Sequence, residues 1–227
     1  MQNKQYDLCL RVLQRMDKAG VLQHLVLVGS WCLVLYREYF KGIGTIHAVR
    51  TRDMDFLVPI PFRLREKVDL PSLLKDLGFL VSLRGQQGVI QLVHPEVLIE
   101  FLVPERGRGS DVVMDLPGLG VNAQPLRFMD IPLMMSVKLH FGNVPVLAPH
   151  PAAFALHKLL IVPRRRNAEK KSRDLDAGVL VLTLLDKKGE IQVAKNLLSR
   201  FPRTWARSIL TVLREGGQEA LAKQIEK

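Results

Sequence analysis

Two aspartates stand two positions apart in the first quarter of the chain, in a setting that predicts metal chemistry. Asp53 and Asp55 alternate with Met54 and Phe56, and such alternation is typical of a β-strand with one buried face. Side chains two positions apart in a strand point to the same face of the sheet, so the two carboxylates are expected side by side. Neighbouring carboxylates repel each other unless a cation lies between them. The pattern therefore predicts a hard-metal site, and Mg²⁺ held by two carboxylates usually also binds the phosphates of a substrate.

A candidate phosphate site precedes the aspartates. Residues 25–28 form an apolar run that is short enough for a buried strand, and Gly29 and Ser30 end it. The following residues, 31–40, can form a helix, for which Ser30 is a good N-cap residue. Since a helix N-terminus offers free N–H groups to an anion, the Gly29-Ser30 turn is the predicted phosphate cradle.

A third acidic residue lies in a later apolar strand. Glu100 is the single charged residue of the predicted strand 97–103. A lone acid is costly to bury unless it is paired or binds a metal, so Glu100 is expected to complete the carboxylate set. In the alternative interpretation the strand is half-exposed, and Glu100 faces solvent while Ile99 and Phe101 face the core.

A Gly-Ser turn, a helix and then an Asp-x-Asp strand resemble the DNA polymerase β-like nucleotidyltransferase superfamily. The closest likeness is to its small prokaryotic members, including the nucleotidyltransferase toxins of abortive-infection systems, whose corresponding stretch is similar to Arg50-Thr51-Arg52-Asp53-Met54-Asp55. The resemblance implies the α+β nucleotidyltransferase fold: a mixed β-sheet flanked by helices and followed by a C-terminal helical region.

The resemblance also implies roles for individual residues. The implied catalytic residues, which would hold two Mg²⁺ ions or Mn²⁺ in their place, are Asp53, Asp55 and Glu100. A helical motif with a triphosphate-binding lysine is similar to His157-Lys158, the run 164–166 and the stretch from Lys170 to Asp176. The implied residues for binding an NTP such as ATP are Gly29, Ser30, Lys158 and Asp174. On charge alone, the run 164–166 and the lysines after it fit a solvated basic connection between two helices.

The pattern of elements predicts two domains. Residues 4–18 and 70–78 fit helices, and the later segments of extended character are 79–84, 89–94, 97–103, 124–129, 136–141 and 144–149. The last of these is expected at a sheet edge because it contains two prolines. Helical patterns dominate from His150 onward, so we expect a catalytic domain at 1–149 and a helical domain at 150–227. Residues 104–122 fit a loop from which Arg106 and Arg108 could reach a ligand.

Charge and composition bear on the partners. The net charge of +11 on 227 residues favours polyanions such as nucleic acid, nucleotides or anionic membranes, although many soluble proteins are simply basic. Cys9 and Cys32 form neither a disulfide framework nor a zinc motif, which fits a reducing cytoplasm. No signal-peptide pattern or membrane-spanning stretch is present in the sequence, so we expect a cytoplasmic protein without a membrane partner.

The resemblance implies an enzyme that transfers a nucleoside monophosphate from an NTP to an acceptor hydroxyl. Positive charge and the toxin-like motifs favour an RNA acceptor such as a tRNA end, and a toxin would have a cognate antitoxin. Other acceptors stay open, namely a small molecule such as an aminoglycoside or a hydroxyl group of a protein. A non-catalytic module that binds nucleotide or RNA is the alternative from a different functional class.

Overall fold

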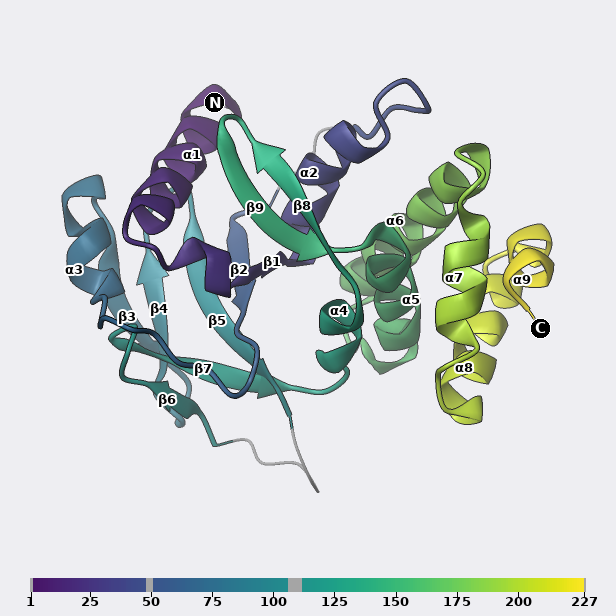
Figure 1. Ribbon diagram of the computed structural model, residues 1–227. Helices are drawn as coiled ribbons and strands as arrows, with labels where there is room; N and C mark the ends of the chain where they lie inside the picture. The colour runs from purple at the N-terminus through teal and green to yellow at the C-terminus, as the bar shows by residue number, and fades with distance from the viewer. Residues whose placement is uncertain (1, 48–50, 106–111, 227) are drawn as a thin grey trace. The chain divides into compact units, whose positions relative to one another are not determined.

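The computed structural model describes residues 2–47, 51–105 and 112–226 (Figure 1). The α-helices in this part of the chain are α1 (Gln2–Lys18), α2 (Cys32–Tyr39), α3 (Leu70–Leu74), α4 (Asp130–Met134), α5 (Pro151–Ile161), α6 (Ala168–Lys187), α7 (Ile191–Leu198), α8 (Arg203–Glu215) and α9 (Glu219–Ile225). The strands are β1 (Val26–Val28), β2 (Asp53–Leu57), β3 (Leu80–Arg84), β4 (Val89–Val93), β5 (Leu98–Pro104), β6 (Met114–Leu116), β7 (Val121–Leu126), β8 (Ser136–Phe141) and β9 (Val144–Pro149). The predicted α+β fold with C-terminal helices is confirmed.

The chain forms two compact units. Unit 1 comprises Met1–Leu35 and His47–Ala148, and unit 2 comprises Tyr36–Ile46 and Pro149–Lys227. The division passes through α2, whose first half belongs to unit 1 and whose last residues belong to unit 2. The separation into domains 1–149 and 150–227 stays a prediction about independently folding parts.

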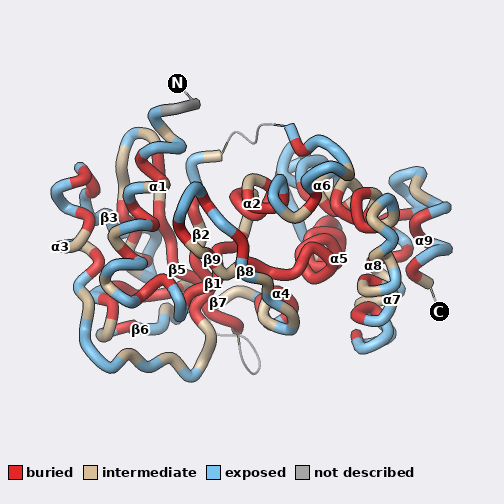
Figure 2. Tube along the Cα trace, turned by 45° about the horizontal axis from the view of Figure 1, so that its top comes forward, coloured by how far each residue is buried: buried red, intermediate tan, exposed pale blue. Residues whose placement is uncertain are grey.

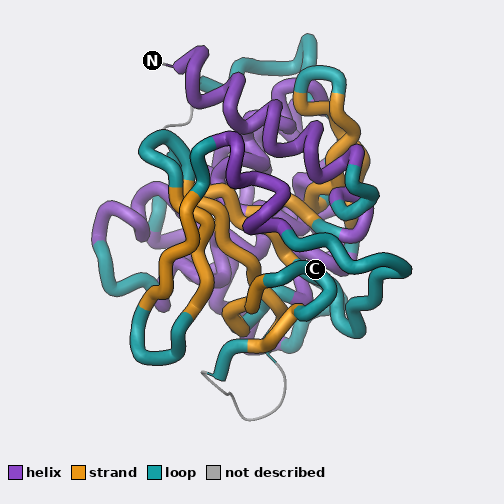
Figure 3. Tube along the Cα trace, turned by 90° about the vertical axis from the view of Figure 1, so that its left-hand side faces the viewer, coloured by secondary structure: helices purple, strands orange, loops and turns teal. Residues whose placement is uncertain are grey.

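Unit 1 is built on a mixed sheet with the strand order β3-β4-β5-β2-β1-β9-β8 (Figure 3, orange). β3, β4 and β5 form the antiparallel meander that the short Gly- and Pro-containing turns predict. β2 pairs with β5 in parallel and with β1 in the antiparallel sense. β7 pairs in parallel with the last residues of β5 and antiparallel with β6.

Two predicted strands differ from the structure. β9 lies between β1 and β8, so the expectation of an edge position for residues 144–149 was wrong. β9 is paired with β1 at one position only, between Val26 and Leu147. Its prolines lack the backbone N–H that strand pairing uses. The strand predicted at 124–129 is β7 at Val121–Leu126 instead, because Phe128 adopts a positive φ of 67° beyond its end. The predicted loop 104–122 contains β6, and Arg106 and Arg108 lie outside the described residues.

The centre of the sheet is buried (Figure 2). All three residues of β1 are inaccessible to solvent or nearly so, because this strand lies in the interior of the sheet. Val26 and Val28 pack against Leu57, Leu102 and Met129. This cluster fixes the strands that carry the candidate site. The apolar run at residues 25–28 thus contains the buried strand that the sequence predicts.

Unit 2 contains the helices that the C-terminal third predicts. α5 is buried along residues 151–160, and α6 packs against it (Figure 2). Gly178 of α6 permits this close approach, because a Cβ at this position would lie 2.8 Å from Cγ of Leu159. His150 caps α5 by accepting a hydrogen bond at Nδ1 from the N–H of Ala152. None of the described helices combines the length and the apolar character that a membrane span requires.

Candidate active site

The strand register brings the Gly-Ser turn, Asp55 and Glu100 onto three adjacent strands of unit 1. Val28, which directly precedes Gly29, is paired with Asp55 across the antiparallel strands β1 and β2. Asp55 is paired with Glu100 across the parallel strands β2 and β5. Laterally paired residues lie on the same side of a sheet. The three features that the sequence singles out are therefore neighbours at one end of β1.

The alternation of burial along β2 orients the two aspartates. Met54 and Phe56 are fully buried, whereas Asp53 is exposed and Asp55 is half-buried. Met54 and Phe56 share one face of β2, so the two carboxylates share the opposite face, as the sequence pattern predicts.

The glycine of the turn touches the carboxylate of Asp55. Gly29 has a φ of +72°, and a Cβ at this position would lie 2.7 Å from Oδ2 of Asp55. Any larger residue would therefore meet the carboxylate as well as an unfavourable backbone conformation. This packing places the backbone of the turn directly against one of the predicted metal ligands.

Ser30 is not the N-cap of α2, contrary to the expectation. It lies inside a 3₁₀ turn, Gly29–Trp31, and α2 begins at Cys32, whose N–H bonds to the carbonyl oxygens of Gly29 and Ser30. The tight turn satisfies the backbone without the serine side chain, which explains the error. Within the part of the chain that the structure describes, no side-chain hydrogen bond caps this turn, and the N–H groups at its start suit an incoming anion.

Glu100 is buried and paired, which excludes the alternative in which it faces solvent. Its Oε1 accepts a hydrogen bond from Nε2 of Gln91 at 2.7 Å and lies 3.0 Å from a guanidinium nitrogen of Arg84. Arg84 also donates to Oε1 of Gln124 at 2.6 Å. The sequence did not indicate Arg84 and Gln91 as partners of Glu100. They reach Glu100 through the meander, whose antiparallel pairing sets Gln91 beside Glu100.

The carboxylates of unit 1 suit a metal ion that is also coordinated by oxygen atoms of a substrate. Within the described residues, no group of three or more His, Cys, Asp or Glu side chains is gathered closely enough to hold a metal alone. Mg²⁺ commonly takes only one or two protein carboxylates and completes its shell with water and phosphate oxygens. Asp53 and Asp55 match this requirement. Glu100, the third predicted ligand, is engaged by Arg84 and Gln91.

The predicted residues of unit 2 form a buried ionic cluster. Nζ of Lys158 lies 2.5 Å from Oδ1 of Asp174, and Nε of Arg165 lies 2.6 Å from Oδ2. Burial raises the pKa of the Asp174 carboxyl, but Lys158 and then Arg165 outweigh it and hold the pKa below its usual value. The sequence pointed to Lys158 and Asp174 but not to Arg165 as their partner, because the neighbouring arginines 164 and 166 are indistinguishable from it by residue type.

His157 beside this cluster stays uncharged. Burial lowers its pKa to about 3, with a further decrease from the positive charge of Lys158, and Asp174 opposes the shift only in part. Its Nε2 is buried and has no hydrogen-bond partner among the described residues. His157 therefore adds no charge to the cluster at neutral pH.

A family model described as "Nucleotidyltransferase" matches residues 8–200 of the chain. The chain belongs to this nucleotidyltransferase family. The match includes every residue proposed for the site, in both units, so the resemblance read from the Gly-Ser and Asp-x-Asp motifs is confirmed at the level of the family.

Two solved structures share the fold of this nucleotidyltransferase family member. ANT(2″)-Ia in complex with adenylyl-2″-tobramycin has a TM-score of 0.53 at 13% identity, with 88% of this chain and 99% of that chain covered. An antigenic nucleotidyltransferase-like protein from Paracoccidioides brasiliensis has a TM-score of 0.54 at 13% identity, with 99% and 94% covered. No curated protein matches the chain in sequence. The likeness confirms the predicted nucleotidyltransferase fold.

Replacing Gly29 by alanine tests the close packing of the turn against Asp55. Gly29→Ala is expected to destabilise the protein and to displace Asp55, with a loss of activity beyond the loss of stability. Gly217→Ala is the matched control, because Gly217 has a φ of +73° but nothing within 4 Å of a Cβ. The control should show only the backbone cost of roughly 1–2 kcal/mol in the free energy of unfolding. Equal losses in both variants, measured by denaturant unfolding, would contradict a special role for the contact with Asp55.

Proposed function

We propose that the protein transfers a nucleoside monophosphate from an NTP such as ATP to an acceptor hydroxyl, with Asp53 and Asp55 as the metal-binding residues. The observation that carries the proposal is the packing of Gly29 against Oδ2 of Asp55. A phosphate bound by the turn would lie next to the carboxylates that must share a cation with it. Family membership supports the same chemistry.

The residues divide the reaction between them. Mg²⁺, or Mn²⁺ in its place, would supply Lewis-acid activation of the acceptor hydroxyl and charge stabilisation of the leaving pyrophosphate. The backbone N–H groups of the Gly29-Ser30 turn bind the phosphates and orient them toward Asp53 and Asp55. Glu100 is the proposed third carboxylate and would have to give up its ion pair with Arg84 to serve.

Lys158 and Asp174 are proposed nucleotide-binding residues on the strength of the motif. Their ion pair is buried, so the Lys158 ammonium is held in one position by Asp174 rather than left to move in solvent. A preset cation loses little side-chain entropy when a phosphate reaches it. Asp174 is accordingly a positioning residue that acts through Lys158.

We further propose an RNA acceptor, for which the charge distribution is the main support. Unit 2 carries 18 Lys and Arg against 9 Asp and Glu, which accounts for +9 of the total of +11. Among the described residues, the exposed side chains of Arg166, Lys170 and Lys171 have no ion-pair partner. Such a surface attracts a polyanion and disfavours a cationic small molecule like the tobramycin named with ANT(2″)-Ia. The toxin-like motifs add the proposal of a cytoplasmic toxin with a tRNA substrate and a cognate antitoxin.

A screen with labelled nucleotides tests the activity and the acceptor together. The purified protein is incubated with Mg²⁺ and each α-labelled NTP in the presence of total tRNA, bulk protein or tobramycin. We expect label on RNA. Label on tobramycin or on protein would replace the proposed acceptor, and the absence of label from every acceptor would favour a non-catalytic binding module.

Neutralising the unpaired cations should weaken RNA binding in a salt-dependent way. In the variant Arg166→Gln, Lys170→Gln, Lys171→Gln, we expect lower affinity for tRNA and a flatter dependence of affinity on salt, because fewer counterions are released. Arg164 and Arg165 are left unchanged, since Arg165 bonds to Asp174 and Arg164 donates to the carbonyl of Leu160. Unchanged affinity at every salt concentration would remove this segment from the RNA-binding surface.

A further inference from the structure

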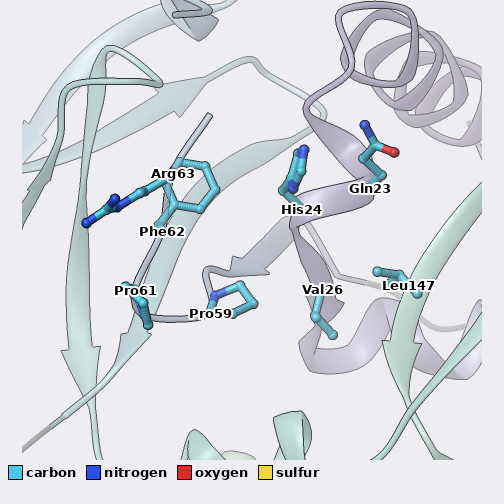
Figure 4. A pocket seen from close by; sticks show the side chains of 8 residues that line it. All are labelled: Gln23, His24, Val26, Pro59, Pro61, Phe62, Arg63 and Leu147. Atoms are coloured by element: carbon cyan, nitrogen blue, oxygen red, sulfur yellow. The ribbon is translucent and has the colours of Figure 1, made fainter. Parts of the chain in front are cut away.

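We infer that a pocket in unit 1, lined by Phe62 and His24, binds one nucleotide unit at a place separate from the candidate active site (Figure 4). The chemistry it would recognise is a planar heteroaromatic base that carries a phosphate. This ligand is either a free nucleotide or one unpaired residue of the RNA acceptor, so the biological meaning of the inference rests on the proposed function.

The register of β1 separates this pocket from the catalytic residues. The pocket includes Val26, the first residue of β1, and Pro59, which follows β2 by two positions. Val26 is paired with Leu57, whereas Val28 at the other end of the strand is paired with Asp55. Because β1 and β2 run antiparallel, the pocket lies at the end of β1 opposite the Gly-Ser turn. Asp53 and Asp55 are not among the residues that line the pocket.

The walls and the floor of the pocket suit an aromatic ring. Phe62, Pro61 and Pro59 line one side of it, and His24, Val26 and Leu147 line the other side (Figure 4). The ring of Phe62 is half-buried and lies near Gly118, where a Cβ would be 4.0 Å from Cε1. Base stacking on aromatic side chains is the usual way in which proteins hold unpaired nucleotides without reading a duplex.

The size of the pocket fits a single nucleotide unit. Its volume is about 270 Å³, just below the range of about 300–1,000 Å³ that is typical of pockets for drug-sized ligands. The occupant must therefore be one small group, either free or projecting from a larger chain.

The charges at the rim favour an anionic occupant. Arg63 lines the pocket, is exposed and has no hydrogen-bond or ion-pair partner among the described residues. The side chain of Gln23 and the imidazole of His24 are further polar groups of the lining. A base stacked on Phe62 would bring its phosphate near the guanidinium group of Arg63.

The test measures binding without turnover. Fluorescence anisotropy of a labelled hexaadenylate RNA, and competition by AMP, are recorded in EDTA for the wild type, Phe62→Ala, His24→Ala and Arg63→Gln. We expect Phe62→Ala to weaken binding by about tenfold, the usual effect of removing one stacking platform. Arg65→Gln is the matched control, because Arg65 is an exposed arginine of the same segment that does not line the pocket.

The outcomes are decisive in each arm. If AMP competes with the RNA and the binding of AMP is weakened in Phe62→Ala, the occupant of the pocket can be a free nucleotide. If Phe62→Ala weakens the binding of RNA only, the occupant is a nucleotide residue of RNA. Wild-type affinity in both Phe62→Ala and His24→Ala would overturn the inference, as would equal losses in Arg63→Gln and Arg65→Gln. The variant Asp53→Asn, Asp55→Asn should bind the RNA normally. We expect this double variant to lose turnover and to keep RNA binding. The proposed function and the proposed pocket are thus tested separately, and either proposal can fail without the other.

Discussion

Asp55→Asn is expected to lower nucleotidyl transfer by about 10²–10³-fold or more, with Asp53→Asn close behind. Each change removes a carboxylate that would hold the cation, and the cation is what neutralises charge on the reacting phosphates. Neither change should lower the free energy of unfolding by more than a small amount. Asp53 is exposed, and removing one of two neighbouring negative charges relieves repulsion. The measurement is the initial rate with saturating Mg²⁺ alongside an unfolding curve for each variant.

Asp115→Asn is the matched control for these variants. Asp115 is an exposed aspartate on another strand of unit 1, and it should leave the rate unchanged. Glu100→Gln extends the series to the third proposed carboxylate, because glutamine can still accept the hydrogen bond from Gln91. Full activity in Asp53→Asn and Asp55→Asn would exclude the metal-binding role, and full activity in Glu100→Gln alone would leave Glu100 as a structural partner of Arg84.

Asp174→Asn is expected to lower the free energy of unfolding by about 3–5 kcal/mol, because the buried ammonium of Lys158 then lacks its counter-charge. The double variant Lys158→Met, Asp174→Leu should recover most of this loss, since it leaves no unpaired buried charge of the pair. Asp176→Asn, an exposed position two residues further along α6, is the control and should cost little. Chemical denaturation measures all three.

The same ion pair predicts the direction of the pH dependence. The folded-state pKa of Asp174 lies below its usual value, so the stabilisation is present above the unfolded pKa of about 3.9 and is lost as pH falls through the lowered folded value. The difference in stability between the wild type and Asp174→Asn should therefore be constant near neutral pH and shrink only in acid. A difference that vanishes at neutral pH would contradict the assignment of a charged pair.

The sequence predicted the shared strand face of the two aspartates, but not the side chains that pair with Glu100. Periodicity placed Asp53 and Asp55 on one face of a strand because alternation is a local property. The pairing of Val28 with Asp55 and of Asp55 with Glu100 was not predicted, since no local signal encodes which strands become neighbours. The ion pair of Glu100 with Arg84 depends on the register of a whole meander.

The errors in the fold also have local causes. Ser30 has the residue type of an N-cap, but the positive φ of Gly29 permits a 3₁₀ turn that uses backbone groups instead. The prolines of β9 suggested a sheet edge, whereas the structure accommodates them in an interior strand that contacts β1 at one pair. Phe62 and Arg63 were part of a segment with scattered charge, and only the folded chain sets them beside His24.

The most direct test of the account follows the phosphorus atom that is transferred. The wild-type protein is incubated with Mg²⁺ and tRNA, in parallel with NTP labelled at the α-phosphate and with NTP labelled at the γ-phosphate. Nucleotidyl transfer predicts that the α-label becomes attached to RNA, that the γ-label leaves as pyrophosphate, and that Asp55→Asn abolishes both. Attachment of the γ-label to the acceptor, or α-label transfer that persists at the wild-type rate in Asp55→Asn, would contradict the proposed reaction and the site built on Gly29 and Asp55.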